Sequence, residues 1–436
     1  MLRICDDIYY RVYGNFTYVR SVVQRRDFLF NEIVYDILTF IEQNPDCTSD
    51  GLLMSLREIY DVGDSSLERD ISEFIEILLQ NEIIWSPSDK EKAGAERIRD
   101  IVHAVCGASG QIMSVCLELT YRCNEKCIHC YIDDFRDCGK ELRLRDYVRV
   151  IDELAEMNCL SLLITGGEPT LHPDFLEIVR YAQKRRMLVN LYTNGLAIES
   201  DMLDELIELR PNSISFSFYG GTPAVHDGIT GIQGSFEKSM RTLLLVKARG
   251  IDVFIKTVVM KQNVHDYENL LKLSRKLGVT VESTMTVMYS HSGVPADRFR
   301  LMDVEAYKRV MRLEQKYSPK EIDAASAKSD SVCGCGRDAL SVNPYGEVYP
   351  CNAYPVSIGN IHEMTIREIW TQSEELKRIR KMTYRDLGAD CGECRQREWC
   401  SPCLGSAIRE NGFPARSADS CMLAEALKES VSGGFL

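Results

Sequence analysis

The sequence lacks the features of a membrane-spanning or secreted chain. In 436 residues, no apolar run approaches the ~18 residues that a membrane-spanning helix needs. The first ten residues carry Asp6 and Asp7 where a secretory signal would have basic and then apolar residues. We therefore expect a cytoplasmic protein that makes no contact with a membrane.

Basic residues are also scarce. The chain has 52 lysines and arginines against 65 aspartates and glutamates, a net charge of −13. Residues 1–85 contain no lysine and only seven arginines against sixteen acidic residues, which gives this segment a net charge of −9. A nucleic-acid-binding surface needs basic residues to displace counterions, so this composition argues against a nucleic-acid partner.

Cysteine, in contrast, is abundant, with 17 in the chain. Disulfides are rare in a reducing compartment, so these thiols are more plausible as metal ligands. Cys123, Cys127 and Cys130 lie in the stretch LELTYRCNEKCIHCY with the spacing C-x3-C-x2-C. Three thiolates can hold a four-iron cluster and leave its fourth iron open to a small molecule, whereas a structural zinc site normally closes with four ligands.

A second motif follows the next apolar run, SLLITGGEP, where Gly166, Gly167, Glu168 and Pro169 come in succession. Together with the three cysteines it resembles the radical S-adenosylmethionine (radical SAM) superfamily. The resemblance implies that the open iron binds the amine and carboxylate of SAM. One electron then cleaves SAM to methionine and a 5′-deoxyadenosyl radical that removes hydrogen from a carbon. The glycines would let the backbone approach the ligand closely, and Glu168 would accept from the methionine ammonium.

The resemblance implies further contacts with SAM. His129 precedes the third cysteine, where the family usually has an aromatic residue against adenine, and Tyr131 would share this contact. The alternative that His129 is an ordinary surface histidine stays open. Polar residues on later strands would contact the ribose and the methionine carboxylate, although each could equally be an ordinary strand residue without a ligand. These residues are Thr193, Asn194, Ser215, Ser217 and Lys256.

Strand and helix patterns alternate between residues 113 and 315, which predicts a parallel sheet with the chemistry at the carboxyl ends of its strands. Six units favour an open, partial (β/α)6 barrel in an α/β fold. The expected strands are Val115–Thr120, Ser161–Thr165, Leu188–Thr193, Ser213–Phe218, Asp252–Met260 and Thr280–Met288. The expected helices are Leu142–Met157, Pro173–Arg186, Asp201–Leu209, Ser235–Arg249 and Tyr267–Leu277.

Residues 1–87 are predicted to form a separate winged-helix domain, and residues 88–112 a linker with one helix. Two alternating runs around Gly14 indicate a hairpin, and Asn31 is a plausible helix cap. The domain resembles PqqD-like peptide recognition elements. This implies that it binds a leader peptide as an added strand between its sheet and its third helix, with an acidic groove favouring a basic leader. The expected elements are Ile8–Tyr13, Tyr18–Val23, Asn31–Gln43, Ser49–Tyr60, Ser65–Gln80 and Glu82–Trp85.

The last segment, residues 316–436, contains eight cysteines. Its paired C-x2-C units alone would suit zinc, but one zinc ion would use only four of them. Their order, with Gly346-x4-Cys351, resembles the SPASM extension of radical SAM enzymes. This implies two auxiliary four-iron clusters, held by Cys333, Cys335, Cys351 and Cys403, and by Cys391, Cys394, Cys400 and Cys421. The close spacing of the first two cysteines raises the hypothesis that one of them is a poor ligand and leaves an open iron.

The three segments together resemble maturases of ribosomally made peptides, with three four-iron clusters and SAM as cofactors. Such an enzyme would install a thioether between a cysteine sulfur and an acceptor carbon of a precursor peptide. The α-carbon would make it a sactipeptide enzyme and the β- or γ-carbon a ranthipeptide enzyme, which overall likeness favours. A flavodoxin or ferredoxin would supply electrons. Carbon–carbon crosslinking is the alternative reaction, and a sensor or peptide-binding protein without turnover is the alternative class.

Overall fold

The computed structural model describes residues 2–5, 7–45, 47–60, 64–85, 110–132, 140–319 and 332–432. Most of the linker expected at 88–112 lies outside these residues. The chain divides into two compact units. The first unit comprises Met1–Met113 with the short segments Ala155–Leu160 and Lys184–Leu188, and the second comprises the remainder.

The first unit contains a three-stranded antiparallel sheet followed by three helices. The predicted hairpin is confirmed: β2 (Ile8–Tyr13) pairs with β3 (Phe16–Ser21) across a turn in which Gly14 has a φ of 56°. A third strand, β4 (Arg26–Asn31), was not predicted, and it pairs with β3. Asn31 is consequently the last residue of a strand and not a helix cap, because the aromatic alternation of RDFLFN continues the sheet up to this residue.

The helices of this unit cover one face of the sheet. They are α1 (Ile33–Gln43), α2 (Ser49–Ile59) and α3 (Asp64–Gln80), and β1 (Arg3–Ile4) pairs with β5 (Ile84–Trp85). Helical spacing places four apolar side chains of α1 in one buried core with side chains of the sheet, α2 and α3. The four are Val34, Ile37, Leu38 and Ile41.

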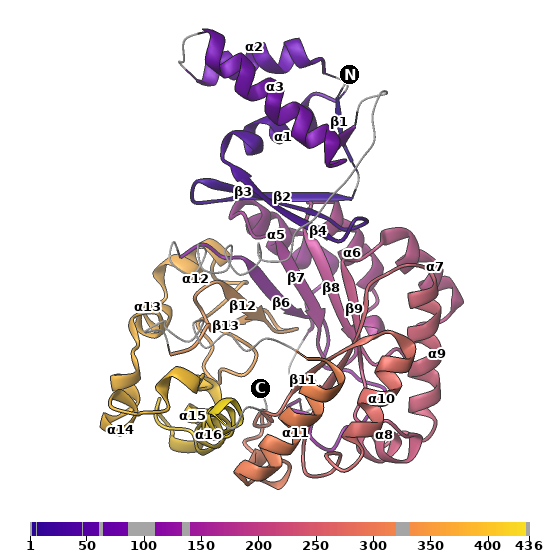
Figure 1. Cartoon of the computed structure of the whole chain (residues 1–436), viewed down its shortest axis with the longest axis vertical. Helices are drawn as coiled ribbons and strands as arrows, with labels where there is room; N and C mark the ends of the chain where they lie inside the picture. Colours follow the sequence, from indigo (N-terminus) through magenta and orange to yellow (C-terminus); the bar gives the residue numbers. More distant parts are fainter. Residues whose placement is uncertain are drawn as a thin grey trace. The chain divides into compact units, whose positions relative to one another are not determined.

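The second unit is built on a parallel α/β sheet, as predicted. Figure 1 shows its strands side by side, with helices outside them. The strands β6 to β11 follow one another in sequence order across the sheet. They are β6 (Ser114–Glu118), β7 (Ser161–Thr165), β8 (Leu188–Thr193), β9 (Ser213–Ser217), β10 (Val253–Val258) and β11 (Thr280–Thr284).

The helices between these strands agree with the alternating pattern of the sequence. They are α5 (Leu144–Glu156), α6 (Phe175–Lys184), α7 (Ser200–Leu209), α9 (Ser235–Ala248) and α10 (Tyr267–Leu277). A further helix, α11 (Val304–Tyr317), follows β11 and was not predicted. A short additional helix, α8 (Pro223–Thr230), follows β9. The expected partial (β/α)6 architecture is therefore confirmed.

The cysteine-rich segment continues this sheet. Strand β12 (Ala339–Val342) pairs in parallel with β6, and β13 (Glu347–Tyr349) and β14 (Gly359–Asn360) extend the sheet antiparallel to nine strands. Five α-helices accompany it: α12 (Ile366–Gln372), α13 (Glu374–Lys381), α14 (Ala389–Gly392), α15 (Leu404–Asn411) and α16 (Ala418–Ser432). The pairing with β6 places the cysteine-rich segment in the same compact unit as the barrel.

Candidate functional site

Three cysteines come together on the loop that follows β6. The thiols of Cys123, Cys127 and Cys130 are partly buried, and the pKa of Cys127 is raised by burial, by Glu125 and by the other two thiols. The loop is held in place by α8, because Lys126 N donates to Thr230 O at 2.8 Å. The predicted ligands thus lie near one another at the carboxyl end of a barrel strand.

These three thiols suit a soft, multi-iron group. Burial raises the pKa of Cys123 to about 12, so a bound cationic metal would be needed to hold the thiolate form. Among the described residues, no set of three or more His, Cys, Asp or Glu side chains converges as the ligands of a single metal ion would. The donor set fits a four-iron cluster held by three cysteines.

The two glycines of the GGEP motif lie against the stretch that leads into Cys123. Gly167 N donates to Thr120 O at 2.7 Å, and Glu168 N donates to Arg122 O at 2.8 Å. A Cβ on Gly166 would lie 2.4 Å from Thr120 O, and one on Gly167 would lie 2.4 Å from Arg122 O. The close approach that requires glycine here is therefore to the chain's own backbone, which fixes the start of the cysteine loop.

Glu168 is buried and held by four donors. Its Oε1 accepts from Thr170 N at 3.2 Å, Thr170 Oγ1 at 2.6 Å and Thr193 Oγ1 at 2.7 Å, and its Oε2 accepts from Asn194 N at 2.8 Å. Pro169 begins the 3-10 turn Pro169–Leu171 that Glu168 caps. Three of the four donors meet Oε1 and only one meets Oε2, so Oε2 keeps a lone pair for one more donor.

Asn194 links the end of β8 to the cysteine loop. Its Nδ2 donates to Asn124 Oδ1 at 2.6 Å and lies 3.9 Å from Cys123 Sγ. The structure thus brings Thr193, Asn194 and Glu168 together with the three cysteines. They come from three separate stretches of the sequence, and the parallel sheet gathers these at one edge.

His129 and Tyr131 have different surroundings. The His129 Nδ1 atom is buried without a hydrogen-bond partner, and its ring lies edge-on to Tyr219 at 4.5 Å. Burial lowers the pKa of His129 to about 4, so the ring is neutral near pH 7. The Tyr131 hydroxyl instead donates to Glu118 Oε1 at 2.5 Å. His129 therefore retains a polar atom for a ligand.

The remaining predicted contacts lie on β9 and β10. Ser215 is buried, and Ser217 is the register partner of Lys256. The Lys256 ammonium pairs with Glu282 at 2.5 Å and lies 4.8 Å from the Tyr192 ring centre. Lys256 therefore already has partners on neighbouring strands.

The cysteines of the last segment form two groups. In the first group, hydrogen bonding from the Cys335 thiol lowers the pKa of both Cys333 and Cys351. Cys403 lies near Cys333 and Cys351. In the second group, burial is the largest of the effects that raise the pKa of Cys400 to about 12. The charges of Cys421, Cys394 and Cys391 also raise it. The members of each predicted set of four therefore lie near enough to influence one another's pKa.

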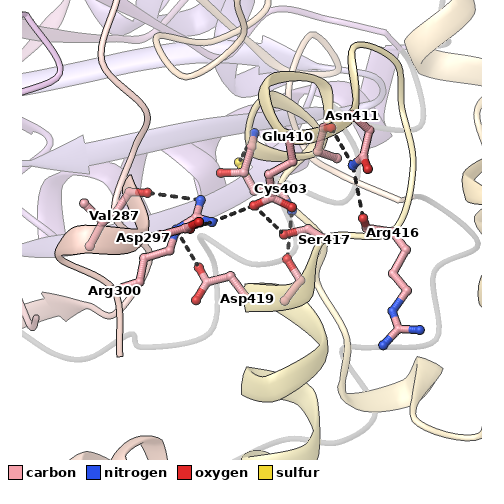
Figure 2. A network of polar contacts seen from close by, with 12 residues as sticks. Val287, Asp297, Arg300, Cys403, Glu410, Asn411, Arg416, Ser417 and Asp419 are labelled. Atoms are coloured by element: carbon pink, nitrogen blue, oxygen red, sulfur yellow. Dashed lines mark hydrogen bonds and ion pairs between the residues drawn. The ribbon is translucent and has the colours of Figure 1, made fainter. Parts of the chain in front are cut away.

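A buried arginine in the segment after β11 joins this segment to the helix that carries Cys421. Figure 2 shows Arg300 among carboxylates from three segments. Its Nη1 lies 2.6 Å from Glu410 on α15, and its Nε lies 3.9 Å from Asp419 on α16. Arg300 is 3% exposed, and its Nη2 donates to Val287 O at 3.5 Å. This network holds α15 and α16 to the segment after β11.

Sequence reasoning missed Glu118, Tyr219 and Arg300. Glu118 left a visible signal, because a carboxylate inside the apolar strand pattern SVCLEL is rarely buried without a partner. Arg300 and Tyr219 left none, since their partners come from distant parts of the chain.

Known protein families match the two parts of this site. Residues 117–274 match the radical SAM superfamily, and residues 333–403 match SPASM, an iron–sulfur cluster-binding domain. The chain is 27% identical over 322 residues to an AdoMet-dependent heme synthase of Methanosarcina barkeri, which covers 68% of this chain and 92% of that protein. It is 28% identical over 343 residues to a PqqA peptide cyclase of Ruegeria pomeroyi, which covers 73% and 91%.

Solved structures share the fold. Streptococcus suis SuiB bound to its precursor peptide SuiA superposes with a TM-score of 0.66 at 16% identity, covering 96% of this chain and 100% of that chain. The enzyme anSMEcpe with bound AdoMet gives a TM-score of 0.60 at 17% identity, covering 74% and 98%.

The fold, the cysteine loop and the family matches define a radical SAM enzyme. Its cysteine-rich segment is a SPASM region, and the chain is related to the heme synthase and peptide cyclase named above. In the part of the chain that the structure describes, no helix is both long and apolar enough to cross a bilayer.

Proposed function

We propose that this enzyme installs thioether crosslinks in a ribosomally made precursor peptide. The observation that supports the proposal is that three thiols lie near one another after β6, and that the eight cysteines of the SPASM region influence one another's pKa within two sets. The first group would hold the cluster that cleaves SAM, and the two others would hold iron–sulfur clusters that can take up an electron. Proteins similar to this chain include a PqqA peptide cyclase and a mycofactocin maturase of Mycobacterium tuberculosis, the latter 29% identical over 326 residues.

Cys123, Cys127 and Cys130 would hold the SAM-binding cluster. When bound there, the cluster and SAM supply a 5′-deoxyadenosyl radical that removes hydrogen from the acceptor carbon. Glu168 Oε2 is positioned to accept from an ammonium group, and the neutral His129 ring offers its unpartnered Nδ1 to the adenine. Thr193 and Asn194 keep the Glu168 carboxylate oriented by donating to it.

The first unit would bind the leader peptide as an added strand. The edge of β2 is occupied by side chains, since Arg186 Nη1 donates to Ile8 O at 2.9 Å and Arg11 Nη1 donates to Tyr10 O at 2.7 Å. We therefore assign the leader to the edge of β4. The net charge of −9 over residues 1–85 favours a leader rich in lysine or arginine.

The leader proposal has its own test. Binding of a labelled leader to the full enzyme should weaken as salt rises from 0.05 to 0.5 M, because the Debye length shortens to less than ~10 Å. Replacing the leader's basic residues by glutamine should weaken binding and flatten the salt dependence. An affinity that changes neither with salt nor on glutamine substitution would exclude recognition of the leader by charge.

Carbon–carbon crosslinking is the second candidate, favoured by the likeness to a peptide cyclase. Mass spectrometry of a cysteine-containing precursor, incubated anaerobically with SAM, a reductant and a flavodoxin or ferredoxin, separates the two. Loss of two hydrogens with loss of one alkylatable thiol supports the thioether. Loss of hydrogens with every thiol still alkylatable supports the carbon–carbon bond. Fragmentation then distinguishes an α-thioether from the β- or γ-thioether that we favour.

A further inference from the structure

A buried arginine of the first unit lacks the partners that such a charge needs. Two other arginines of this unit are also buried, and both are paired. Arg11 donates to three backbone carbonyls at 2.7, 2.9 and 3.2 Å, and Arg20 lies 3.0 Å from Asp27. Arg26 is 9% exposed. In the described part of the chain, its Nε, Nη1 and Nη2 atoms have no hydrogen-bond partner.

Arg26 is the first residue of β4, the strand to which we assign the leader. Successive side chains of a strand point to opposite faces of the sheet. Phe28 and Phe30 pack into the core formed with the three helices, whereas Leu29 packs on the opposite face. Arg26 therefore lies on the helix-covered face, and its guanidinium carbon lies 5.0 Å from the Phe28 ring centre. Among the described strands, none pairs with the outer edge of β4.

The turn before β4 is tied to the end of α3. Gln24 Nε2 donates to Asn81 O at 3.1 Å and to Glu82 Oε2 at 2.8 Å. The start of β4 therefore lies next to the residues that follow the third helix, where an added strand between the sheet and this helix would run. Gln24 Oε1 is also buried without a partner among the described residues. This corner of the unit thus carries unpaired donors and an unpaired acceptor.

The chemistry of Arg26 specifies the partner that is missing. A guanidinium has five N–H donors and no acceptor, and a carboxylate can accept two of these hydrogen bonds side by side. Burial of the charge without such a partner costs free energy. Arg20 and Asp27 show the paired arrangement in the same sheet, since they are register partners on β3 and β4. Opposite residues on neighbouring strands have Cβ atoms ~4.5–5.5 Å apart, so a side chain on an added strand reaches Arg26 in the same way.

We propose that Arg26 binds the carboxylate of one aspartate or glutamate in the leader, on the strand that adds to β4. The net charge of −9 over residues 1–85 attracts a basic leader, whereas Arg26 selects the one acidic residue that faces the start of β4. A charge pair of this kind fixes the register of the bound strand. This inference rests on the proposed function and adds to it a specificity residue and the chemistry of its partner.

Calorimetric titration of the full, iron-loaded enzyme tests the proposal. The probe is the leader of the cysteine-containing precursor used in the crosslinking assay, amidated at its C-terminus so that only side chains supply carboxylates. Each aspartate or glutamate of the leader is replaced in turn by its amide. One replacement should weaken binding to the parent at least about tenfold, because it leaves a buried charge unpaired. The same replacement should change binding to Arg26→Met less than about twofold.

Charge reversal and a neighbouring arginine complete the binding experiment. Arg26→Glu should prefer, at least about tenfold, a leader in which the selected acidic residue is replaced by lysine. Arg25→Gln is the matched control, because it removes a positive charge from the adjacent, exposed residue, and it should keep the discrimination of the parent. Discrimination that persists in Arg26→Met overturns the proposal. A parent that is indifferent to every acidic residue of the leader does so as well.

Unfolding of the enzyme without leader gives an independent readout. Arg26 has no partner to lose among the described residues, so Arg26→Met should leave the midpoint of denaturant unfolding unchanged or raise it. Arg20→Met leaves the buried Asp27 without its cation and should lower the midpoint. An equal lowering in both variants would show that Arg26 holds the fold together as Arg20 does, and this result overturns the proposal.

These readouts separate the inference from the proposed function, because neither requires turnover. A parent that shows the discrimination but never changes the mass of the precursor refutes the thioether proposal and leaves the assignment of Arg26 intact. A parent that crosslinks the precursor but shows no discrimination refutes the role of Arg26 alone. A leader that does not bind the parent refutes both the place of the leader on β4 and the role of Arg26.

Discussion

At the scale of single residues, Gly167 is the position where one methyl group should disrupt the site. A Cβ there would lie 2.4 Å from Arg122 O and 2.7 Å from Tyr121 O, and both atoms belong to backbone that cannot rotate away. We expect Gly167→Ala to cost about 1–3 kcal/mol of stability and to displace the cysteine loop. The measurements are denaturant unfolding and bound iron of the anaerobically prepared protein.

Gly228 provides the control for this substitution. It lies within α8 with nothing within 4 Å of an added Cβ, so Gly228→Ala should be neutral or slightly stabilising. Equal iron loss in both variants would show that the flexibility of glycine, and not the close approach to residues 121 and 122, determines how much iron is bound.

His226 should make the enzyme sensitive to mild acid. Its ring is fully buried, its Nδ1 accepts from Tyr219 N at 3.2 Å, and burial lowers its pKa to about 4. The unfolded chain therefore binds a proton at higher pH than the folded chain, and stability falls as pH drops from ~6.5 towards 4. The expected loss between pH 7 and pH 5 is about 2 kcal/mol.

The measurement is the pH dependence of unfolding for the parent and for His226→Asn, whose amide oxygen can still accept from Tyr219 N. The variant should be less stable at pH 7 because it leaves a void, but its slope between pH 7 and pH 5 should be smaller. The exposed His362 serves as a control, and His362→Asn should keep the parent's slope. A variant His226→Asn with the parent's slope would contradict the assignment.

The residues of the site differ in how far they could be predicted. Cys123 and Glu168 stand in short motifs, so their types and spacing were visible in the chain. The role of Gly167 was predicted incompletely, because its neighbour is the backbone of the loop after β6 and not a ligand. Glu118 was overlooked because its tyrosine partners follow it on a loop whose path only the structure shows.

At the scale of elements, local patterns were sufficient for the barrel. Alternating strand and helix patterns placed β7 and β8 at the observed residues, since each buried strand is a short apolar run between polar turns. The pairing of β12 with β6 was not predictable in this way. Ser114 and Ala339 are register partners although they are far apart in the sequence, and no local pattern encodes such a pair.

The Arg300 network is the element-scale device that we expect to support the auxiliary clusters. Arg300→Met would leave the half-buried Glu410 and the buried Asp419 carboxylates without their cation, which costs about 3–5 kcal/mol. Because Asp419 lies on α16 two residues before Cys421, loosening this helix should also broaden or shift the electron paramagnetic resonance signals of the auxiliary clusters. Unfolding and spectra of the reduced protein measure the two effects.

Lys308→Met is the matched control. Lys308 also pairs with two carboxylates, Glu305 and Glu429, but these pairs are exposed and contribute little. Its unfolding and spectra should match those of the parent. The stability of Arg300→Lys should lie between those of Arg300→Met and the parent, since an ammonium keeps the charge but cannot reach every partner of the guanidinium.

At the scale of the whole molecule, we propose that eleven cysteines form three sets of cluster ligands that serve different steps. The set after β6 has no fourth thiol, which leaves room for a ligand, whereas each SPASM set has four, which suits clusters that only exchange electrons. The sheet that runs from β11 through β6 to β14 carries the first set and Cys351 in one compact unit. Radical formation and electron uptake would therefore take place on one continuous scaffold.

This separation predicts that single clusters can be removed. The anaerobically reconstituted parent should bind about 12 irons, four for each cluster. Cys391→Ala combined with Cys394→Ala should reduce this to about 8 and stop crosslinking, yet 5′-deoxyadenosine should still form because the set after β6 is intact. Cys123→Ala combined with Cys127→Ala should also leave about 8 irons but abolish 5′-deoxyadenosine. Cys5→Ala, outside all three sets, should keep the parent's iron content. Iron analysis and product assays on the four proteins test this arrangement against two others. With a single zinc ion in the SPASM region, the first double variant would lose no iron. With a single auxiliary cluster, it would lose the whole auxiliary iron content.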